Sequence, residues 1–204
     1  MTKARGTLPR YCSQCGSPLT LTVDARATPT CIACGTVHYD TPRPLVLCAV
    51  FAGHRLLLMR RATPPYVGRW APPGGFAEAG ETLQEATVRE VFEETGVRLD
   101  PSALIPLAIT SVAHMNQVYI MFRAHVDECR LQPGDEALEA RWFDEAELPF
   151  DNFWLPDWIP GVRAIYTSVR SGSFKLYLGE ATEQGLSSRS FGLVDRVRRS
   201  SSDD

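Results

Sequence analysis

Residues 75–97 read GFAEAGETLQEATVREVFEETGV, and this stretch contains six glutamates but only one basic residue, Arg89. On a helix, like charges three or four residues apart repel each other by about 0.2–0.5 kcal/mol per pair. So much negative charge in one short segment is typical either of a solvated acidic surface or of a site that binds a cation. The residues around the glutamates favour the second interpretation.

Both ends of a helix are marked in this stretch, which predicts a helix from about Thr82 to Thr95. Thr82, followed three residues later by Glu85, has the pattern of a capping box. Gly96 stands where a glycine commonly ends a helix. On a helical wheel, the predicted apolar face holds Val88, Val91, Phe92 and Thr95, and the opposite face holds Glu90, Glu93 and Glu94.

The charge on the predicted acidic face is only partly neutralised within the helix. Arg89 pairs most simply with Glu93, one turn later. Carboxylate oxygens are the ligands that Mg²⁺ and Mn²⁺ prefer. The glycines before the helix, Gly74, Gly75 and Gly80, allow the backbone to approach a bound ligand closely. We therefore expect a site for a divalent cation.

The same stretch resembles the Nudix box, G-x5-E-x7-R-E-U-x-E-E-x-G-U with U apolar, at every fixed position. Those positions are Gly75, Glu81, Arg89, Glu90, Val91, Glu93, Glu94, Gly96 and Val97. The resemblance implies a Nudix hydrolase with an α/β/α sandwich built around a mixed sheet. Such enzymes cleave a nucleoside diphosphate linked to another moiety, between its phosphates, with bound Mg²⁺ or Mn²⁺.

The resemblance also implies a role for each residue of the box. Glu90 and Glu94 resemble the main metal ligands, and the Gly74 carbonyl resembles a backbone ligand. Glu93 resembles a further ligand or the group that activates the attacking water, while Arg89 holds the glutamates in place. The residues expected to support the box are Gly75, Glu81 and Gly96.

Nudix enzymes often take one more carboxylate from outside the box, and the acidic segment GDEALEARWF at 134–143 is the obvious source. Glu139, three residues before Trp142, is similar in position to a metal-site glutamate of the NADH pyrophosphatases. We expect Glu139 to join the catalytic site, with Glu136 as the second choice. The alternative for either is a surface carboxylate at the start of a strand.

Two CxxCG pairs precede the box-containing part of the chain and indicate a structural zinc ribbon. The four cysteines are Cys12, Cys15, Cys31 and Cys34. In a chain without signs of secretion, this spacing is typical of a tetrahedral Zn²⁺ site that is closed to substrate. A thioredoxin-like redox pair would need one CxxC at a helix start in a βαβ unit, which is not seen. His38 is left out because four cysteines already suffice.

The predicted organisation of the 204 residues has four parts. Residues 1–8 read as a flexible leader, 9–40 as the zinc ribbon, 41–181 as the Nudix domain, and 182–204 as a disordered, serine-rich tail. Strands are predicted in LVLCAVF, RLLLMRR, LIPLAITSV, NQVYIMFRAHV, ARWFD and FKLYLG. A short amphipathic helix is predicted in WIPGVRAIYTSVRS.

A zinc ribbon ahead of a Nudix domain resembles two groups, over roughly residues 10–160. The NADH pyrophosphatases, which also remove NAD caps from RNA, carry an SQPWPFPxS segment that is missing from this chain. The other group includes FAD pyrophosphatases and ADP-ribose pyrophosphatases, with phrases similar to GRWAPPGGFAEAGET. We favour the second group, and expect FAD or ADP-ribose to be split to AMP and another phosphate ester.

The substrate-binding candidates are weaker, because each has a structural alternative. An aromatic residue before the glycine loop, Trp70, would stack on a base or cover the core. Arg60 and Arg61 would approach phosphates or be solvated. The remaining candidates for the pocket are Tyr66, His114 and Gln117.

Composition excludes several other classes. The net charge of −3 gives no overall basic field for nucleic acid, and residues 11–40 hold only Arg26 as a basic residue. No apolar run is long enough for a membrane span or a signal peptide, so a cytoplasmic location is expected. A non-catalytic Nudix regulator remains an alternative, although all the box glutamates are present. The resemblance suggests a homodimer.

Overall fold

A computed structural model describes residues 9–19, 29–172, 175–182 and 185–192. The predicted leader, residues 1–8, and the end of the predicted tail, residues 193–204, lie outside the described residues. Within the described residues, no helix combines the length and apolar character needed to cross a bilayer.

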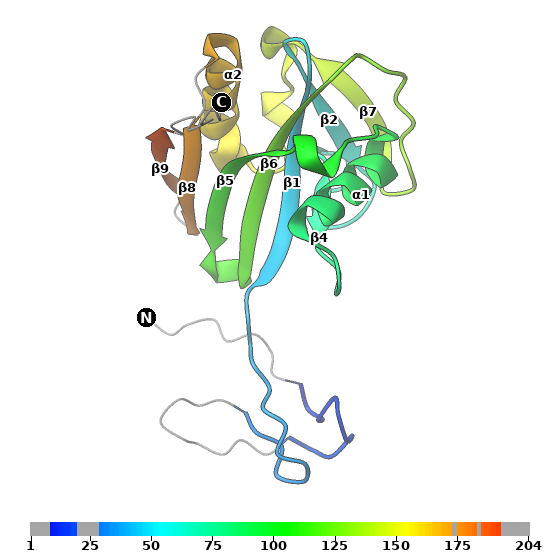
Figure 1. Cartoon of the computed structure of the whole chain (residues 1–204), viewed down its shortest axis with the longest axis vertical. Helices are drawn as coiled ribbons and strands as arrows, with labels where there is room; N and C mark the ends of the chain where they lie inside the picture. The colour runs from blue at the N-terminus through cyan, green and yellow to red at the C-terminus, as the bar shows by residue number, and fades with distance from the viewer. Residues whose placement is uncertain (1–8, 20–28, 173–174, 183–184, 193–204) are drawn as a thin grey trace, which may run out of the picture.

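The described residues form one nine-stranded sheet and two α-helices (Figure 1). The strands are β1 (Arg43–Ala52), β2 (Arg55–Arg61), β3 (Trp70–Ala71), β4 (Gly74–Phe76), β5 (Ile105–Val112), β6 (Gln117–Val126), β7 (Ala137–Phe143), β8 (Lys175–Thr182) and β9 (Gly185–Gly192). The helices are α1 (Leu83–Thr95) and α2 (Ile159–Ser171). Short 3₁₀ turns cover Pro101–Ala103, Ala113–Met115, Glu145–Glu147, Phe150–Asn152 and Pro156–Trp158.

The sheet is mixed, as the Nudix resemblance implies. Its main order is β3-β2-β1-β6-β5-β8-β9, with β4 added on β1 and β7 on β2. Strands β1 and β6 run parallel, as do β5 and β8, while the other pairs are antiparallel. The predicted fold class is therefore confirmed.

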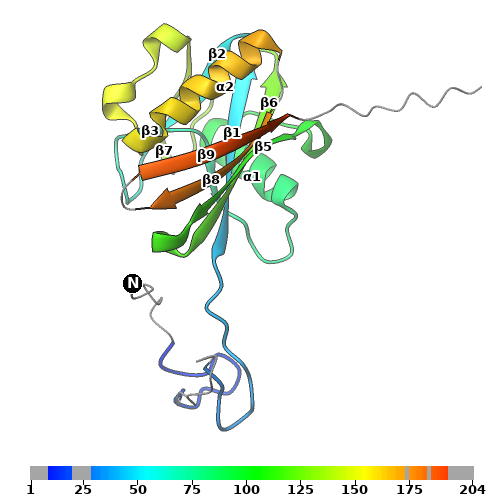
Figure 2. The ribbon, with the colours of Figure 1, turned by 90° about the vertical axis from the view of Figure 1, so that its left-hand side faces the viewer.

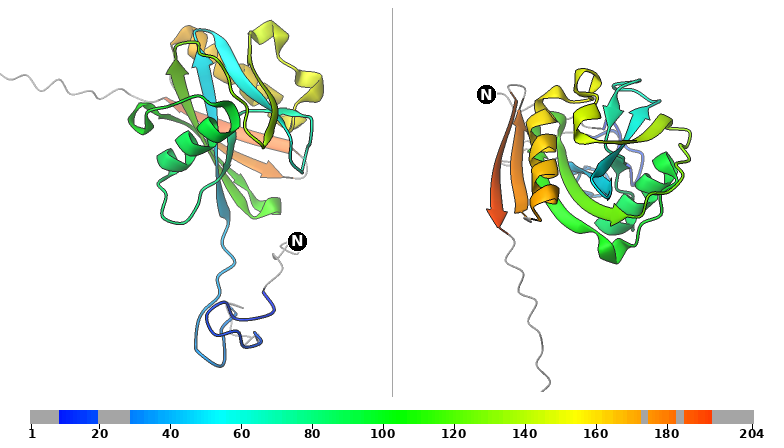
Figure 3. Two further views of the ribbon diagram at one scale, coloured as in Figure 1. Left: turned by 90° about the vertical axis from the view of Figure 1, so that its right-hand side faces the viewer. Right: turned by 90° about the horizontal axis from the view of Figure 1, so that it is seen from above.

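The two helices cover opposite faces of the sheet. Because successive side chains of a strand point to opposite faces, one strand can pack against both helices. Along β1, Leu47, Ala49 and Phe51 pack into the cluster that contains α2, whereas Cys48, Val50 and Ala52 pack into the cluster that contains Val91 of α1. Figure 2 shows α2 crossing in front of the sheet, and Figure 3 shows α1 from the other side. Strand β1 is apolar on both faces and therefore contributes side chains to both cores.

The predicted tail needs a correction, because residues 185–192 form β9, which pairs antiparallel with β8 along its whole length. Ser187, Ser188 and Ser190 are exposed on this strand. An edge strand has one free side and is only partly covered, so a serine-rich sequence is compatible with it. Polar composition alone therefore gave the wrong boundary for the tail.

Candidate functional site

Helix α1 begins and ends where the sequence predicts. Thr82 Oγ1 accepts a hydrogen bond from the Glu85 backbone N–H at 3.2 Å, and the Glu85 carboxylate accepts one from the Thr82 backbone at 2.7 Å. Gly96 adopts the left-handed conformation, with φ of 75°, and its N–H bonds the Phe92 carbonyl. The capping box and the terminal glycine fix the register of every box residue.

The orientation of α1 differs from the predicted wheel. Its buried residues are Ala86, Thr87, Val91, Glu94 and Thr95. Phe92, predicted to be apolar core, is 41% exposed and lies under the Arg98 guanidinium at 4.3 Å. The buried face is thus rotated towards the glutamates, so that Glu94 turns inward while Glu93 stays outside.

Arg89 holds the box together through several carboxylates. Its Nε donates to Glu81 Oε1 at 2.6 Å, and its second amino group donates to Glu81 Oε2 at 3.0 Å. The remaining nitrogen donates to Glu90 Oε1 at 2.8 Å and to Glu93 Oε2 at 3.1 Å. The Arg89 hydrogen bonds lower the pKa of Glu81 to about 2. The predicted pair with Glu93 is present, but the forked pair with Glu81 is the stronger one.

Glu94 is the most deeply placed carboxylate of the box, with 3% of its surface exposed. Burial raises its pKa to about 8, although the Gly74 backbone N–H donates to its Oε2 at 2.7 Å and opposes that effect. Burial likewise raises the pKa of Glu90, against the opposing effect of Arg89. Both carboxylates are therefore held in positions where their charge is poorly solvated.

The glycines before α1 are required by close packing. A Cβ at Gly74 would overlap the Val46 carbonyl of β1, and a Cβ at Gly75 would lie 2.5 Å from Glu90 Oε1. The absence of a side chain at these two positions lets β4 lie directly against the box carboxylates. This arrangement brings the backbone into reach of whatever the carboxylates bind.

A cavity of about 690 Å³ opens over these carboxylates. The predicted residues that line it are Gly74, Gly75, Arg89, Glu90, Glu93, Glu94, Tyr66 and Gln117. Arg43 and Arg61 also line it, whereas Arg60 does not. The predicted residues that do not line it are Glu81, Gly96, Glu139, Trp70 and His114.

The carboxylate from outside the box needs a correction, because Glu136 lines the cavity and Glu139 does not. Glu139 lies opposite Arg60 in the β2–β7 pair and forms an ion pair with it at 3.3 Å. The register shifts between Arg60 and Arg61, and the Glu136 carbonyl accepts the Ala62 N–H just before β7 begins. Because of this register shift, the segment just before β7, which carries Glu136, lies at the cavity, whereas Glu139 within the strand does not.

The segment that carries Glu136 is anchored on the end of α1. The Gln132 N–H donates to the Thr95 carbonyl at 2.8 Å. Gly134 packs so closely on the Glu93 carbonyl that a Cβ there would overlap it. Contacts with α1, and not β7 alone, therefore fix the position of Glu136 relative to the glutamates of the box.

The aromatic candidates divide between core and cavity. Trp70 is 9% exposed and packs edge-on against Phe143 with ring centroids 4.8 Å apart, so the core alternative is the right one. His114 is exposed in a 3₁₀ turn and does not line the cavity, although its neighbour Met115 does. Tyr66 lies in the cavity wall, 39% exposed, with a left-handed φ of 70°.

Three further aromatic residues in the cavity wall were missed: Phe76, Tyr119 and Trp154. Tyr119 and Trp154 stack with ring centroids 6.1 Å apart and planes 12° apart, and Tyr66 packs edge-on against Trp154. The signal for Tyr119 was available, since it follows Gln117 by two residues on one strand and therefore shares its face. The segment that contains Trp154 has no periodic pattern and gave no such signal.

A divalent cation fits the carboxylate end of the cavity. Glu94 is buried, and the described residues give it no salt bridge with a basic side chain. A buried carboxylate without a cationic partner is unfavourable when charged. Mg²⁺ is commonly held by one or two carboxylates together with substrate phosphates. Glu90 and Glu94, one helical turn apart and lining the same cavity, supply such a pair.

The four predicted zinc ligands come together. The Sγ atoms of Cys12, Cys15, Cys31 and Cys34 all lie within 4.8 Å of one another. The Cys12–Cys34 and Cys15–Cys31 Sγ distances are 3.7 and 3.5 Å. A tetrahedron with Zn–S bonds of about 2.3 Å requires sulfur separations of about 3.8 Å, so the cluster fits Zn²⁺. His38 Nε2 lies 3.3 Å from Cys12 Sγ, beside the cluster.

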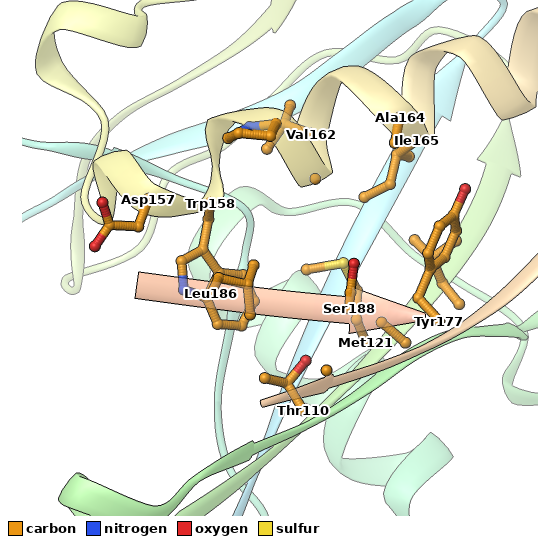
Figure 4. A pocket seen from close by; sticks show the side chains of 15 residues that line it. Thr110, Met121, Asp157, Trp158, Val162, Ala164, Ile165, Tyr177, Leu186 and Ser188 are labelled. Carbon is orange, nitrogen blue, oxygen red and sulfur yellow. The ribbon is translucent and has the colours of Figure 1, made fainter. Parts of the chain in front are cut away.

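A second cavity, of about 190 Å³, lies between α2 and strands β5, β8 and β9 (Figure 4). Its wall is mostly apolar and includes Leu107, Met121, Trp158, Ile165 and Leu186. None of the predicted site residues lines it. The candidate active site is therefore the cavity over the glutamates.

Comparison with known proteins agrees with this geometry. Residues 41–162 match the family described as "NUDIX domain", and residues 10–40 match the zinc ribbon family described as "Nudix N-terminal". A crystal structure of a NUDIX hydrolase from Nitrosomonas europaea superposes with a TM-score of 0.77 at 32% identity, and covers 84% of this chain and 98% of that one.

Curated relatives carry two kinds of name. A NAD-capped RNA hydrolase NudC from Stutzerimonas stutzeri is 34% identical over 142 residues, which are 69% of this chain and 50% of that protein. An ADP-ribose pyrophosphatase from Methanocaldococcus jannaschii is 40% identical over 100 residues, which are 47% of this chain and 58% of that protein. The chain spans about half the length of the curated relatives it matches. The match over residues 41–162, supported by the complete box, places the chain in the Nudix hydrolase family.

Proposed function

We propose that this chain is a metal-dependent pyrophosphohydrolase that splits the diphosphate of a nucleoside diphosphate derivative. The observation that carries this proposal is one cavity in which Glu90, Glu94 and Glu136 face the same space as Arg43 and Arg61. Carboxylates bind divalent cations, and guanidinium groups bind phosphate oxygens. A diphosphate with its metal ion is the ligand that uses both sets.

The chemistry follows from the charges in this cavity. A diphosphate resists attack by water because its oxygens are negative. A cation held by Glu90 and Glu94 would neutralise that charge and lower the pKa of a bound water. Arg61 also lines the cavity and contributes positive charge, with which it would orient the phosphates.

Proton transfer requires a carboxylate that is held in place and reachable by water. Glu93 is held by Arg89 and has 57% of its side chain exposed. Glu136 is exposed on the segment before β7. We assign the general-base role to one of these two side chains, in place of Glu139. Water adds to one phosphorus, the bridging oxygen leaves with the other, and two phosphate monoesters result.

For the substrate, we put NAD-type dinucleotides first. The sequence alone favoured FAD or ADP-ribose, but the curated relatives named NAD-capped RNA hydrolase NudC match a larger part of this chain. Cleavage of NAD between its phosphates would give AMP and nicotinamide mononucleotide. The wide cavity and its aromatic wall are compatible with a substrate that carries a planar ring.

ADP-ribose is the second candidate. The ADP-ribose pyrophosphatase from Methanocaldococcus jannaschii matches a smaller part of this chain, but is 40% identical over that part. The missing SQPWPFPxS segment also fits this candidate better. Both candidates share an adenosine diphosphate group and require the same carboxylates.

Product analysis tests the proposal. The full chain is incubated with Mg²⁺ or Mn²⁺ and with NADH, an NAD-capped RNA, ADP-ribose or FAD, and the products are separated by chromatography. We expect AMP, or 5′-monophosphorylated RNA, from one of these substrates, and at least a hundredfold loss in Glu90→Gln.

The matched control is Glu147→Gln, since Glu147 is an exposed glutamate paired with Arg141 outside the cavity. This variant should keep the wild-type rate. A Glu90→Gln protein that folds normally and hydrolyses at the wild-type rate would contradict the metal-site assignment. Absence of turnover with every substrate would favour the non-catalytic regulator.

A further inference from the structure

The side chain of Gln117 is buried at the cavity wall without a full set of partners. Gln117 is the first residue of β6 and is 7% exposed. Its Oε1 is buried and has no hydrogen-bond partner among the described residues. A buried polar atom without a partner costs about 1–3 kcal/mol. Because Gln117 lines the cavity, rotation of its amide would turn this oxygen towards a bound ligand that supplies the missing donor.

Aromatic rings surround this part of the cavity. Tyr119 lies on the same face of β6, two residues after Gln117, and stacks on Trp154. Tyr66 closes the wall by packing edge-on against Trp154 at a centroid distance of 6.3 Å. All three aromatic side chains line the cavity together with Gln117. Such a wall suits a flat aromatic ring whose polar edge needs a hydrogen-bond partner.

Strand β1 sets the distance between this wall and the carboxylates. On one side, β1 pairs with β4, which carries Gly74 and Gly75; on the other side, it pairs with β6, where Gln117 lies opposite Arg43. Neighbouring strands are about 4.8 Å apart and each residue advances about 3.3 Å along a strand, so Gly75, paired with Val46, and Gln117, paired with Arg43, lie about 14 Å apart at the backbone. The side chains of the box carboxylates and of Gln117 line the space between them, so one nucleotide can reach both ends.

We propose that Gln117 determines specificity at the ring end of the site by binding an NH₂ group of the substrate, either an amino group on its aromatic ring or the NH₂ of a carboxamide attached to that ring. This inference rests on the proposed function for the placement of the phosphates. An amide presents one acceptor and one donor side by side, and keeps both if its oxygen and nitrogen exchange places. Its counterpart is a ring edge with an NH₂ group beside an acceptor. The adenine ring and the carboxamide of nicotinamide both offer this edge.

Binding of products to the full chain tests the proposal and separates the two rings. Calorimetry with Mg²⁺ compares AMP with purine riboside 5′-monophosphate, which lacks only the amino group. It also compares nicotinamide mononucleotide with its 3-acetylpyridine analogue, in which a methyl group replaces the amine. We expect the wild type to prefer the amine in at least one pair by on the order of tenfold, and the pair that responds identifies the ring.

Gln117→Leu should reduce that preference to nearly onefold and leave the melting temperature unchanged or higher, because no satisfied hydrogen bond is lost. Gln84→Leu makes the same change at an exposed position of α1 and should keep the wild-type preference. Equal binding within both pairs, a preference that survives in Gln117→Leu, or no binding of any of these nucleotides would overturn the proposal. These outcomes do not depend on hydrolysis, so failure of the proposed function is seen separately in the product analysis.

Discussion

Replacing Glu94 by glutamine should remove activity and yet stabilise the metal-free protein at alkaline pH. The side chain is 3% exposed, and burial raises its pKa from 4.5 to about 8. A carboxyl whose pKa is higher in the folded state binds its proton more tightly there than in the unfolded chain. The associated stability is complete below pH 4.5 and is lost as the pH rises towards 8.

The magnitude follows from the size of the pKa change. Each pKa unit corresponds to about 1.4 kcal/mol, so the full loss above pH 8 is about 5 kcal/mol. Glutamine stays neutral and retains an acceptor for the Gly74 N–H, but its buried NH₂ group lacks a partner, which costs about 1–3 kcal/mol. At pH 8.5, Glu94→Gln should therefore be about 2–4 kcal/mol more stable than the wild type, whereas at pH 5 it should be equally stable or less stable.

Urea unfolding of both proteins between pH 5 and pH 9, in buffer without Mg²⁺ or Mn²⁺, measures this difference. Titrating groups that do not interact with Glu94 contribute equally to both proteins and cancel in the comparison; the charge of Glu90, which helps to raise the pKa of Glu94, is part of the measured difference. Addition of Mg²⁺ should stabilise the wild type and leave the variant almost unchanged. A stability difference between the two proteins that does not change with pH would refute the conclusion that burial raises the pKa of Glu94. A folded Glu94→Gln enzyme that hydrolyses its substrate at the wild-type rate would refute the assignment of Glu94 to the metal site.

Three further predictions concern the site and the fold. Gly75→Ala places a methyl group against the Glu90 carboxylate, so kcat should fall at least tenfold while circular dichroism stays unchanged; an active variant would show that this contact can relax. Glu136→Gln should lower kcat at least tenfold and Glu139→Gln less than threefold, and the opposite order would restore the assignment made from the sequence. Tyr166→Phe removes a buried hydroxyl that accepts from the β2 backbone and donates to the β7 backbone, so urea unfolding should show a loss of about 1–3 kcal/mol; a variant as stable as the wild type would show that these backbone groups find other partners.

The parts of the structure that the sequence predicted well are those decided by neighbouring residues. The bounds of α1 follow from a capping box and a terminal glycine, both contained in the stretch itself. The cysteine cluster follows from spacing that admits few alternatives. Local signals of this kind do not depend on how distant strands pair.

The errors arise where distant parts of the chain meet. Glu139 was preferred to Glu136 because of its similarity in position to a glutamate of the NADH pyrophosphatases, and the register shift next to Arg61 that favours Glu136 cannot be read from the sequence of β7. Phe92 was assigned to the core because a helical wheel does not show which side the sheet covers. Trp154 was missed because its place in the cavity depends on a non-repetitive segment that returns to Tyr119.

The anchor between the segment before β7 and the end of α1 also bears on how this chain can change during evolution. The hydrogen bond from Gln132 to Thr95 and the close packing of Gly134 fix the last part of that segment. Residues 127–131, between β6 and the anchor, lie outside any strand or helix. Changes of length there would disturb the Arg55–Glu128 ion pair, the bond from Trp142 to the Cys129 carbonyl and the packing of Leu131, but the anchor at Gln132 would still hold Glu136 in its place. A single deletion between Gln132 and Glu136 would instead pull that carboxylate out of the cavity.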